Sequence, residues 1–265
     1  MAVSSVLRNP LTVTLSVWRA LFLREATTTL ARDPMAWFWL IAEPAAHIAL
    51  LMWLFVIGFR QRVIAGADTS VFIMLGVLAF FLPRNMLMRG VAAVGASAAL
   101  YTFRQVKPVD TVIARATLES LLACVIFATV WSGAALLGFP VALADPLGAL
   151  SALGALWLAG LGLALTFSVV ANLNAQTGHL VRMLFAPLYL FSAVIYPSVA
   201  IPISMREVVL ANPLVHGIET LRLAFMPAYV VPPGINLLYL VQFSVVLIFI
   251  GLALHLYCQD WLVER

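Results

Sequence analysis

Residues 234–257 read GINLLYLVQFSVVLIFIGLALHLY, a stretch that contains no Asp, Glu, Lys or Arg. A transmembrane helix needs about 20 predominantly apolar residues to cross the hydrocarbon core of a bilayer. This stretch is long enough and apolar enough to do so. It therefore predicts a membrane-spanning helix, and the rest of the chain has to be compatible with a membrane location.

The whole chain shares this character, since 64% of its 265 residues are hydrophobic and only 10% are charged. Soluble globular domains contain roughly 45–50% apolar and about 25% charged residues. The mean hydropathy of +1.06 is that of an integral membrane protein. This composition excludes an ordinary soluble enzyme and a disordered protein. The net charge of +4, from 15 basic and 11 acidic residues, is too small and too scattered for a nucleic-acid-binding protein.

Apolar stretches of spanning length recur along the chain and leave no room for a large soluble domain. The sequence therefore predicts an all-α polytopic membrane protein that forms a single domain, residues 1–265, with six transmembrane helices. The expected spans are residues 35–59, 69–100, 118–138, 147–171, 180–196 and 234–257. The second span is longer than a bilayer requires, so we expect it to tilt, to kink at Pro83 or to protrude.

Residues 1–34 predict an amphipathic helix that lies in the membrane interface instead of crossing it. The apolar face of this helix consists of Leu11, Leu15, Trp18, Phe22 and Ala26. Glu25 is a flaw in the pattern, because it falls near the apolar edge. The alternative is a cytosolic helix that packs on another part of the protein.

Two internal segments are too polar or too interrupted to span. The loop 101–117 is the most polar internal stretch, and its candidate partner-contacting residues are Arg104, Gln105, Lys107, Pro108, Asp110 and Arg115. Proline followed closely by an acidic residue, as at Pro108 and Asp110, is typical of the first turn of a helix. Residues 197–233 contain several prolines and only short apolar runs. They suit re-entrant or interfacial helices before the last span.

The distribution of basic residues predicts the orientation, because cytoplasmic loops of membrane proteins are enriched in Lys and Arg. With a cytoplasmic N-terminus, the inner segments hold Arg8, Arg19, Arg24, Arg32, Arg104, Lys107, Arg115, Arg182 and Arg265. The outer segments hold Arg60, Arg62, Arg206 and Arg222. This bias predicts that both termini are cytoplasmic.

The motifs exclude several chemistries. Lys107 is the only lysine and precedes Pro108, so the Gly-Lys-Ser/Thr loop that binds ATP phosphates is missing. The four histidines lie on different segments, and Cys124 and Cys258 lie in apolar runs without metal-ligand spacing. We therefore expect a non-catalytic chain without a metal ion or a cofactor of its own.

Glu43, His47, Arg84 and Arg89 are ionisable residues within the first two expected spans, and they are the candidates for a substrate path. A charged side chain at the bilayer centre costs roughly 2.5–3.5 kcal/mol on insertion scales, so each should face protein, a partner or a water-filled path. Arg84 either pairs with Glu43 and ties two helices together, or lines a transport path where its guanidinium meets an anionic substrate. Arg89 is close enough to the inner interface to snorkel.

Three groups of residues, in order along nearly the whole chain, resemble the polysaccharide-export permeases of the ABC-2 type. The matching segments are Arg24-Glu25 with Arg32, Trp39 and Glu43-Pro44; Phe103 to Asp110 with Ala114-Arg115 and Glu119; and Ser192 to Pro197 with Asn212 to Glu219 and Leu221-Arg222. The second group is the most specific and is similar to the cytoplasmic loop of the capsular polysaccharide branch. In the third group, the resemblance marks Tyr196, Asn212, Pro213, Glu219 and Arg222 as candidate residues of the region before the last span.

The resemblance implies a subunit of the bacterial inner membrane that forms a homodimer and pairs with two copies of a separate ABC ATPase, which binds ATP and magnesium. It also implies a coupling helix in the loop 101–117. It implies export of lipid-linked capsular polysaccharide, together with a periplasmic adaptor (a polysaccharide co-polymerase) and an outer-membrane exporter. No nucleic acid is expected as a partner; membrane lipid is.

Two alternatives remain open at this stage. One is an ABC-2 permease for another lipid-linked glycan, such as an O-antigen or a teichoic acid. The other is a secondary transporter or an intramembrane enzyme, either of which would need convergent acid and base groups on facing spans. The few ionisable groups in the expected spans do not suggest such a set.

Overall fold

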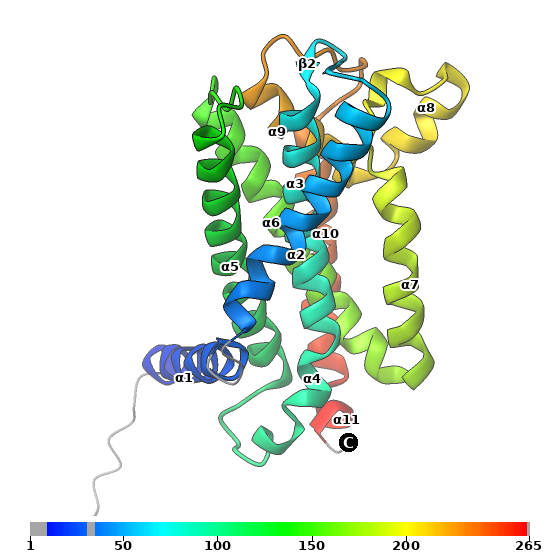
Figure 1. Cartoon of the computed structure of the whole chain (residues 1–265). Helices are drawn as coiled ribbons and strands as arrows, with labels where there is room; N and C mark the ends of the chain where they lie inside the picture. Colours follow the sequence, from blue (N-terminus) through cyan, green and yellow to red (C-terminus); the bar gives the residue numbers. More distant parts are fainter. Residues whose placement is uncertain (1–9, 31–34, 264–265) are drawn as a thin grey trace, which may run out of the picture.

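The computed structural model describes residues 10–30 and 35–263, and these are helical almost throughout (Figure 1). In this part of the chain, five helical segments are long and apolar enough to cross a membrane: Trp37–Gly58, Thr69–Val91, Pro108–Leu136, Pro146–Leu173 and Leu237–Tyr257. They correspond to α2 (Ala36–Met52) with η1 (Trp53–Gly58), and to α3, α5, α6 and α10 with the bounds just given. The expected polytopic all-α membrane protein is confirmed in this coarse form.

A further upright helix, α7 (Ala175–Phe191), runs beside the others in Figure 1. Its 17 residues are about 26 Å long at 1.5 Å per residue, short of the length expected for a span. The helix begins five residues before the expected boundary at 180, because the side-chain oxygen of Asn174 accepts a hydrogen bond from the Gln176 backbone and caps it. It ends at Phe191, just before Ala193, whose φ of 54° is incompatible with a right-handed helix.

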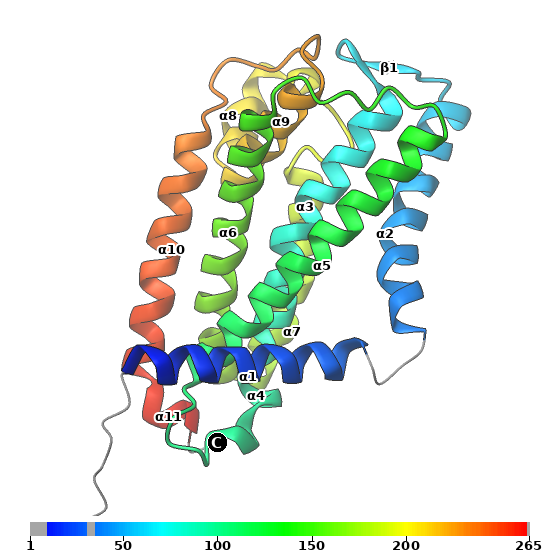
Figure 2. The ribbon, with the colours of Figure 1, turned by 90° about the vertical axis from the view of Figure 1, so that its left-hand side faces the viewer.

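The N-terminal helix α1 (Pro10–Leu30) lies across one end of the upright helices (Figure 2). Leu21 is buried against the bundle, whereas Leu11 and Leu15, on the expected apolar face, remain 71% and 62% exposed. The same end of the molecule carries the short helix α11 (Gln259–Val263) (Figure 2). Residues 1–9 and 31–34 of the expected interface helix lie outside the described residues.

At this end the structure corrects two expected boundaries. The expected span 69–100 is wrong in its last third, because α3 ends at Val91 and is followed by the short helices α4 (Ala93–Ala96) and η2 (Ala98–Leu100). The separate helix expected within 101–117 is also wrong. The helix α5 begins at Pro108 and continues without a break to Leu136, so residues 108–117 are its first turns and only residues 101–107 form the loop. We call residues 101–107 the inner loop.

The central helix α6 packs closely on its neighbours because small residues line its surface. A Cβ atom added to Gly162 would lie 2.8 Å from Leu247 Cβ of α10, and one added to Gly251 of α10 would lie 2.6 Å from Leu165 Cβ of α6. This close approach lets the Thr166 hydroxyl donate a hydrogen bond to the Leu247 carbonyl at 2.9 Å. The pair α6 and α10 therefore forms a tight core for the bundle.

The opposite end, which we call the outer end, is covered by short elements (Figures 1 and 2). They are the hairpin of β1 (Val63–Ile64) and β2 (Ala67–Asp68), then η3 (Ser198–Ala200), α8 (Ile203–Leu210) and α9 (Pro213–Phe225). The hairpin strands are antiparallel, with Ile64 paired to Ala67. Most of α9 is buried, whereas α8 is largely exposed.

Candidate functional site

Asp110 lies in the first turn of α5, and both of its carboxylate oxygens accept hydrogen bonds. One oxygen accepts a hydrogen bond from the Lys107 backbone N–H at 3.0 Å, which is half of a capping box. The other accepts from the indole Nε1–H of Trp18 on α1 at 2.7 Å. Asp110 is only 7% exposed. Its first role is therefore to cap α5 and to fasten α1 to it.

A second contact fastens α1 one helical turn and a half further along α5. The Arg115 Nε lies 2.9 Å from a carboxylate oxygen of Glu25, and both side chains are 12% exposed. This ion pair explains the flaw in the sequence pattern of α1, because Glu25 faces α5 and not the lipid. Pro108, Asp110 and Arg115 thus face the protein, although they were expected to contact a partner.

The inner loop presents the remaining candidates to the outside. The buried Tyr101 holds the loop in place, because its hydroxyl donates to the Val94 carbonyl at 3.2 Å; burial also raises the pKa of Tyr101. Beyond Tyr101, the exposed residues of the loop are Thr102, Phe103, Arg104, Gln105 and Lys107. Phe103 is 62% exposed and was not among the candidates. An apolar ring standing between polar neighbours was the signal that could have singled it out.

Three of the four intramembrane candidates meet in a pocket of about 290 Å³ between α2, α3 and α5, which we call the polar pocket. It is lined by Leu40, Glu43, Pro44, Phe81, Arg84, Asn85, Met88, Arg89, Glu119 and Ile126. The Arg84 guanidinium donates to the Asn85 side-chain oxygen at 3.1 Å and lies over the Phe81 ring at 5.1 Å. Among residues 10–30 and 35–263 no ion pair within 4 Å joins Arg84 to Glu43. The structural pair that the sequence allowed is therefore not formed.

Arg89 and His47 have other partners. The Arg89 Nε lies 2.9 Å from a carboxylate oxygen of Glu119 on α5, so Arg89 is paired instead of merely snorkelling. His47 lies 2.9 Å from the hydroxyl of Tyr189 and so links α2 to α7. It does not line the polar pocket. Of the four intramembrane candidates, only Glu43 and Arg84 line this pocket without an ion-pair partner in the described part of the chain.

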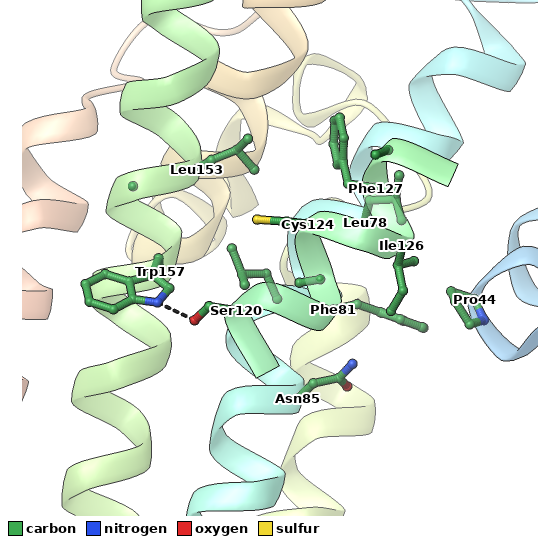
Figure 3. A pocket seen from close by; sticks show the side chains of 14 residues that line it. Pro44, Leu78, Phe81, Asn85, Ser120, Cys124, Ile126, Phe127, Leu153 and Trp157 are labelled. Atoms are coloured by element: carbon green, nitrogen blue, oxygen red, sulfur yellow. Dashed lines mark hydrogen bonds between the residues drawn. The ribbon is translucent and has the colours of Figure 1, made fainter. Parts of the chain in front are cut away.

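An apolar cavity of about 370 Å³ adjoins the polar pocket (Figure 3). It lies between α2, α3, α5 and α6, and the two share Pro44, Phe81, Asn85 and Ile126 as lining residues. Its wall further from the polar pocket is apolar, with Leu153 and Phe127 labelled in Figure 3. The Trp157 indole N–H is satisfied by the Ser120 hydroxyl. The cavity can therefore hold an apolar chain but offers it few polar contacts.

At the outer end, Arg222 is fully buried and makes every contact inside the protein. Its guanidinium lies 2.9 Å from a carboxylate oxygen of Glu219, donates to the carbonyls of Ala193 and Val194 at 2.8 and 2.6 Å, and stacks 3.6 Å over the Phe72 ring. A Cβ atom at Gly76 of α3 would collide with this guanidinium. Arg222 thus joins α9, α3 and the chain after α7. The prediction of orientation from basic residues counted Arg222 as a cation of an outer loop, but its burial shows that it is not one.

The neighbouring candidates also act on the protein's own backbone. The Asn212 side chain caps α9 by accepting from the Leu214 N–H at 3.1 Å, with Pro213 as the first residue of the helix, and donates to the Ser192 hydroxyl at 2.9 Å. The Tyr196 hydroxyl donates to the Leu190 carbonyl at 2.6 Å, and burial raises the pKa of Tyr196. The motif before the last span is therefore a structural clamp.

Nothing in the described residues marks a metal centre. Over residues 10–30 and 35–263 no group of three or more His, Cys, Asp and Glu side chains is placed to hold a metal ion. The candidate functional surfaces are the exposed inner loop, the polar pocket and the apolar cavity.

Comparison with known proteins places the chain in a family. The model of the ABC-2 type transporter family matches residues 16–226. The polysialic acid transport protein KpsM of Escherichia coli is 34% identical over 237 residues, which cover 89% of this chain and 91% of that protein. The capsule polysaccharide export inner-membrane protein CtrC of Neisseria meningitidis is 27% identical over 240 residues, 88% of each chain.

A third relative is similar over most of its length, at lower sequence identity. The capsule polysaccharide export inner-membrane protein BexB of Haemophilus influenzae is 25% identical over 208 residues, 78% of this chain and 77% of that protein. The family model spans most of the chain, and the Escherichia coli relative aligns with it almost from end to end. The chain therefore belongs to the ABC-2 type transporter family of membrane proteins.

Proposed function

We propose that this chain is the transmembrane subunit of an ATP-binding cassette exporter that moves lipid-linked capsular polysaccharide across the bacterial inner membrane. The observation that carries this proposal is the end-to-end similarity to a polysialic acid transport protein, at 34% identity over 89% of the chain. The subunit works as a homodimer with two copies of a separate ATPase, which binds ATP and magnesium. A periplasmic adaptor and an outer-membrane exporter complete the path.

Genetics and purification test this assignment directly. A strain that lacks the gene should keep lipid-linked capsular glycan in the cytoplasm, and the intact gene should restore capsule at the surface. The purified chain should show ATPase activity only together with its partner subunit. Surface capsule in the deletion strain would refute the assignment, whereas retention of an O-antigen or teichoic acid would favour the alternative substrate.

We further propose that α7 is a sixth span and that the inner loop is cytoplasmic. About 26 Å of helix is close to the thickness of the hydrocarbon core, roughly 30 Å, and local thinning accommodates the difference. With six spans both termini lie on the cytoplasmic side. The outer end, with α8 and α9, then lies at the periplasmic face, where their backbone ends are covered by protein.

Cysteine labelling tests the crossing of α7. The exposed residues Gln176, Ile203 and Val230 are each replaced by cysteine in a chain whose Cys124 and Cys258 are changed to serine. In spheroplasts, a membrane-impermeant maleimide should label the variants at 203 and 230. It should label the variant at 176 only after the membrane is permeabilised. Labelling of all three positions from outside would show that α7 does not cross.

The inner loop supplies the ATPase contact, and Phe103 is its anchor. Buried aromatic anchors commonly contribute about 2 kcal/mol or more at interfaces, so Phe103→Ala should weaken binding of the ATPase about tenfold or more. The matched control is Phe59→Ala, since Phe59 is 63% exposed at the opposite end of the molecule. Titration of the ATPase onto the purified subunit measures both. Equal affinities for the two variants would contradict this role for Phe103.

A further inference from the structure

The polar pocket contains one positive and one negative group that have no ion-pair partner among residues 10–30 and 35–263. Arg89 and Glu119 neutralise each other at 2.9 Å, which leaves Arg84 and Glu43. Glu43 is exposed on α2, and no ion pair within 4 Å joins it to any residue in the described part of the chain. Ionised groups at membrane depth are costly unless something pairs with them. The pocket is therefore complementary to a ligand that carries both charges.

The two groups line the same pocket, and each lies near the inner end of its helix. Arg84 is seven residues before the end of α3 at Val91, and Glu43 is seven residues after the start of α2 at Ala36, on helices that run in opposite directions between the inner and outer ends. At 1.5 Å per residue each is about 10 Å from the inner end of its helix. A single head group can reach both side chains.

The apolar cavity continues from this point toward the middle of the bundle. On α3 its lining runs from Asn85, next to Arg84, through Phe81 to Leu78. Leu78 is about 10 Å nearer the outer end than Asn85. In Figure 3, Asn85 lies at one side of the cavity, and Leu153 and Phe127 lie at the other. The order from polar to apolar is that of a phospholipid of the inner leaflet, with its head toward the cytoplasm and its chain toward the bilayer centre.

We propose that the polar pocket and the apolar cavity together bind one zwitterionic glycerophospholipid of the inner leaflet, of the phosphatidylethanolamine class. The phosphate lies against the Arg84 guanidinium, and the ammonium group lies against Glu43. One acyl chain fills the cavity. The choice of leaflet rests on the orientation proposed above, but the site itself does not depend on the identity of the exported substrate.

Charge decides between this lipid and other occupants. An anionic lipid such as phosphatidylglycerol would bring its phosphate near Glu43 without an ammonium group to offset the repulsion. A second copy of the chain would have to present a cation to Glu43 and an anion to Arg84. It would also have to fill the adjoining apolar cavity. A zwitterionic lipid satisfies both charges and the cavity together.

The test measures lipid retained by the full-length chain. The chain is placed in nanodiscs of equal amounts of phosphatidylethanolamine and phosphatidylglycerol, transferred to detergent, and its bound lipid is quantified by mass spectrometry. We expect phosphatidylethanolamine to be retained preferentially. Arg84→Gln should lower the retained amount about tenfold, because a charge-assisted contact to phosphate is lost. Glu43→Gln should shift the preference toward phosphatidylglycerol.

A pair of glycine variants distinguishes loss of the apolar cavity from a nonspecific effect of introducing a large side chain. Gly154 on α6 lines the apolar cavity and has open space beside it, so Gly154→Phe should fill the cavity and abolish retention. Gly133 on α5 also has open space but lines a different apolar pocket, so Gly133→Phe should leave retention unchanged. In the unmodified chain, a phosphatidylethanolamine with a photoreactive group in its acyl chain should crosslink within residues 120–128.

Several results would overturn the proposal. They are the absence of retained phosphatidylethanolamine in the unmodified chain, equal retention in the two glycine variants, and an unchanged lipid preference in Glu43→Gln. Disulfide-linked dimers of Glu43→Cys without bound lipid would assign the pocket to a second copy of the chain. None of these readouts uses export, so a failure here is distinct from a failure of the proposed function.

Discussion

Replacing Arg222 with leucine should lower the thermal unfolding midpoint of the purified protein by about 10 °C or more. The substitution leaves the buried Glu219 without its cation and removes the donors of the Ala193 and Val194 carbonyls. Removing one partner of a buried ion pair costs about 3–5 kcal/mol, and each kcal/mol shifts the midpoint by about 2–4 °C in a chain of this size. Differential scanning fluorimetry in detergent measures the shift.

The matched control is Arg206→Leu in the neighbouring helix α8. Arg206 also donates to backbone carbonyls, but at 3.4 and 3.5 Å and from a half-buried position, so its loss should change the midpoint by about 2 °C or less. The double variant Arg222→Leu with Glu219→Leu removes both charges and should recover part of the loss. A midpoint for Arg222→Leu within about 2 °C of the unmodified protein would mean that the clamp does not stabilise the fold.

Replacing Asp110 with lysine should detach α1 and destabilise the subunit even without its ATPase. Losing the cap costs about 1–2 kcal/mol, and a cation at the positive end of α5 adds about 0.5–1 kcal/mol. The unpaired indole N–H of Trp18 adds about 1–3 kcal/mol. The sum of about 2.5–6 kcal/mol should appear as a lower unfolding midpoint, together with loss of export.

The control variant Arg104→Glu distinguishes an effect on the stability of the subunit from an effect on binding of the ATPase. It also reverses a charge in the same region, but Arg104 is exposed on the inner loop. Its unfolding midpoint should stay within about 1 °C of the unmodified protein, while its affinity for the ATPase falls. If Asp110→Lys instead kept a normal midpoint and lost only ATPase binding, Asp110 would be a docking residue and not a structural one.

The apolar helices could be predicted from the sequence because a segment that lies in lipid has to be long and apolar. The clearest example is α10, which contains no Asp, Glu, Lys or Arg. The ends of helices were harder, because hydropathy does not show where a helix stops. Residues 92–100 are as apolar as a span, yet they hold Gly95 and Ser97 and break into α4 and η2. Conversely, the polar start of α7 is helical because Asn174 caps it.

The roles of charged residues depended on partners that lie far away in the sequence. Glu25 and Arg115 are 90 positions apart, and Trp18 and Asp110 are 92 apart, so no local pattern could pair them. The start of α5 at Pro108 was predictable, because proline and the Asp110 cap act locally. Arg222 was singled out by resemblance, but only its burial shows that it serves the fold.

The unbroken length of α5 gives the molecule a mechanical property. Its 29 residues form a rod about 43 Å long that starts at the inner loop. Near its outer end, Trp131 lies 4.4 Å from the ring of Phe225 on α9, and α1 is fastened to its base. A rotation of the rod by about 5° around its centre would displace each tip by about 2 Å in opposite senses. A push on the inner loop would therefore reach α9 at the outer end as a movement of equal size, because no break in the helix lies between them.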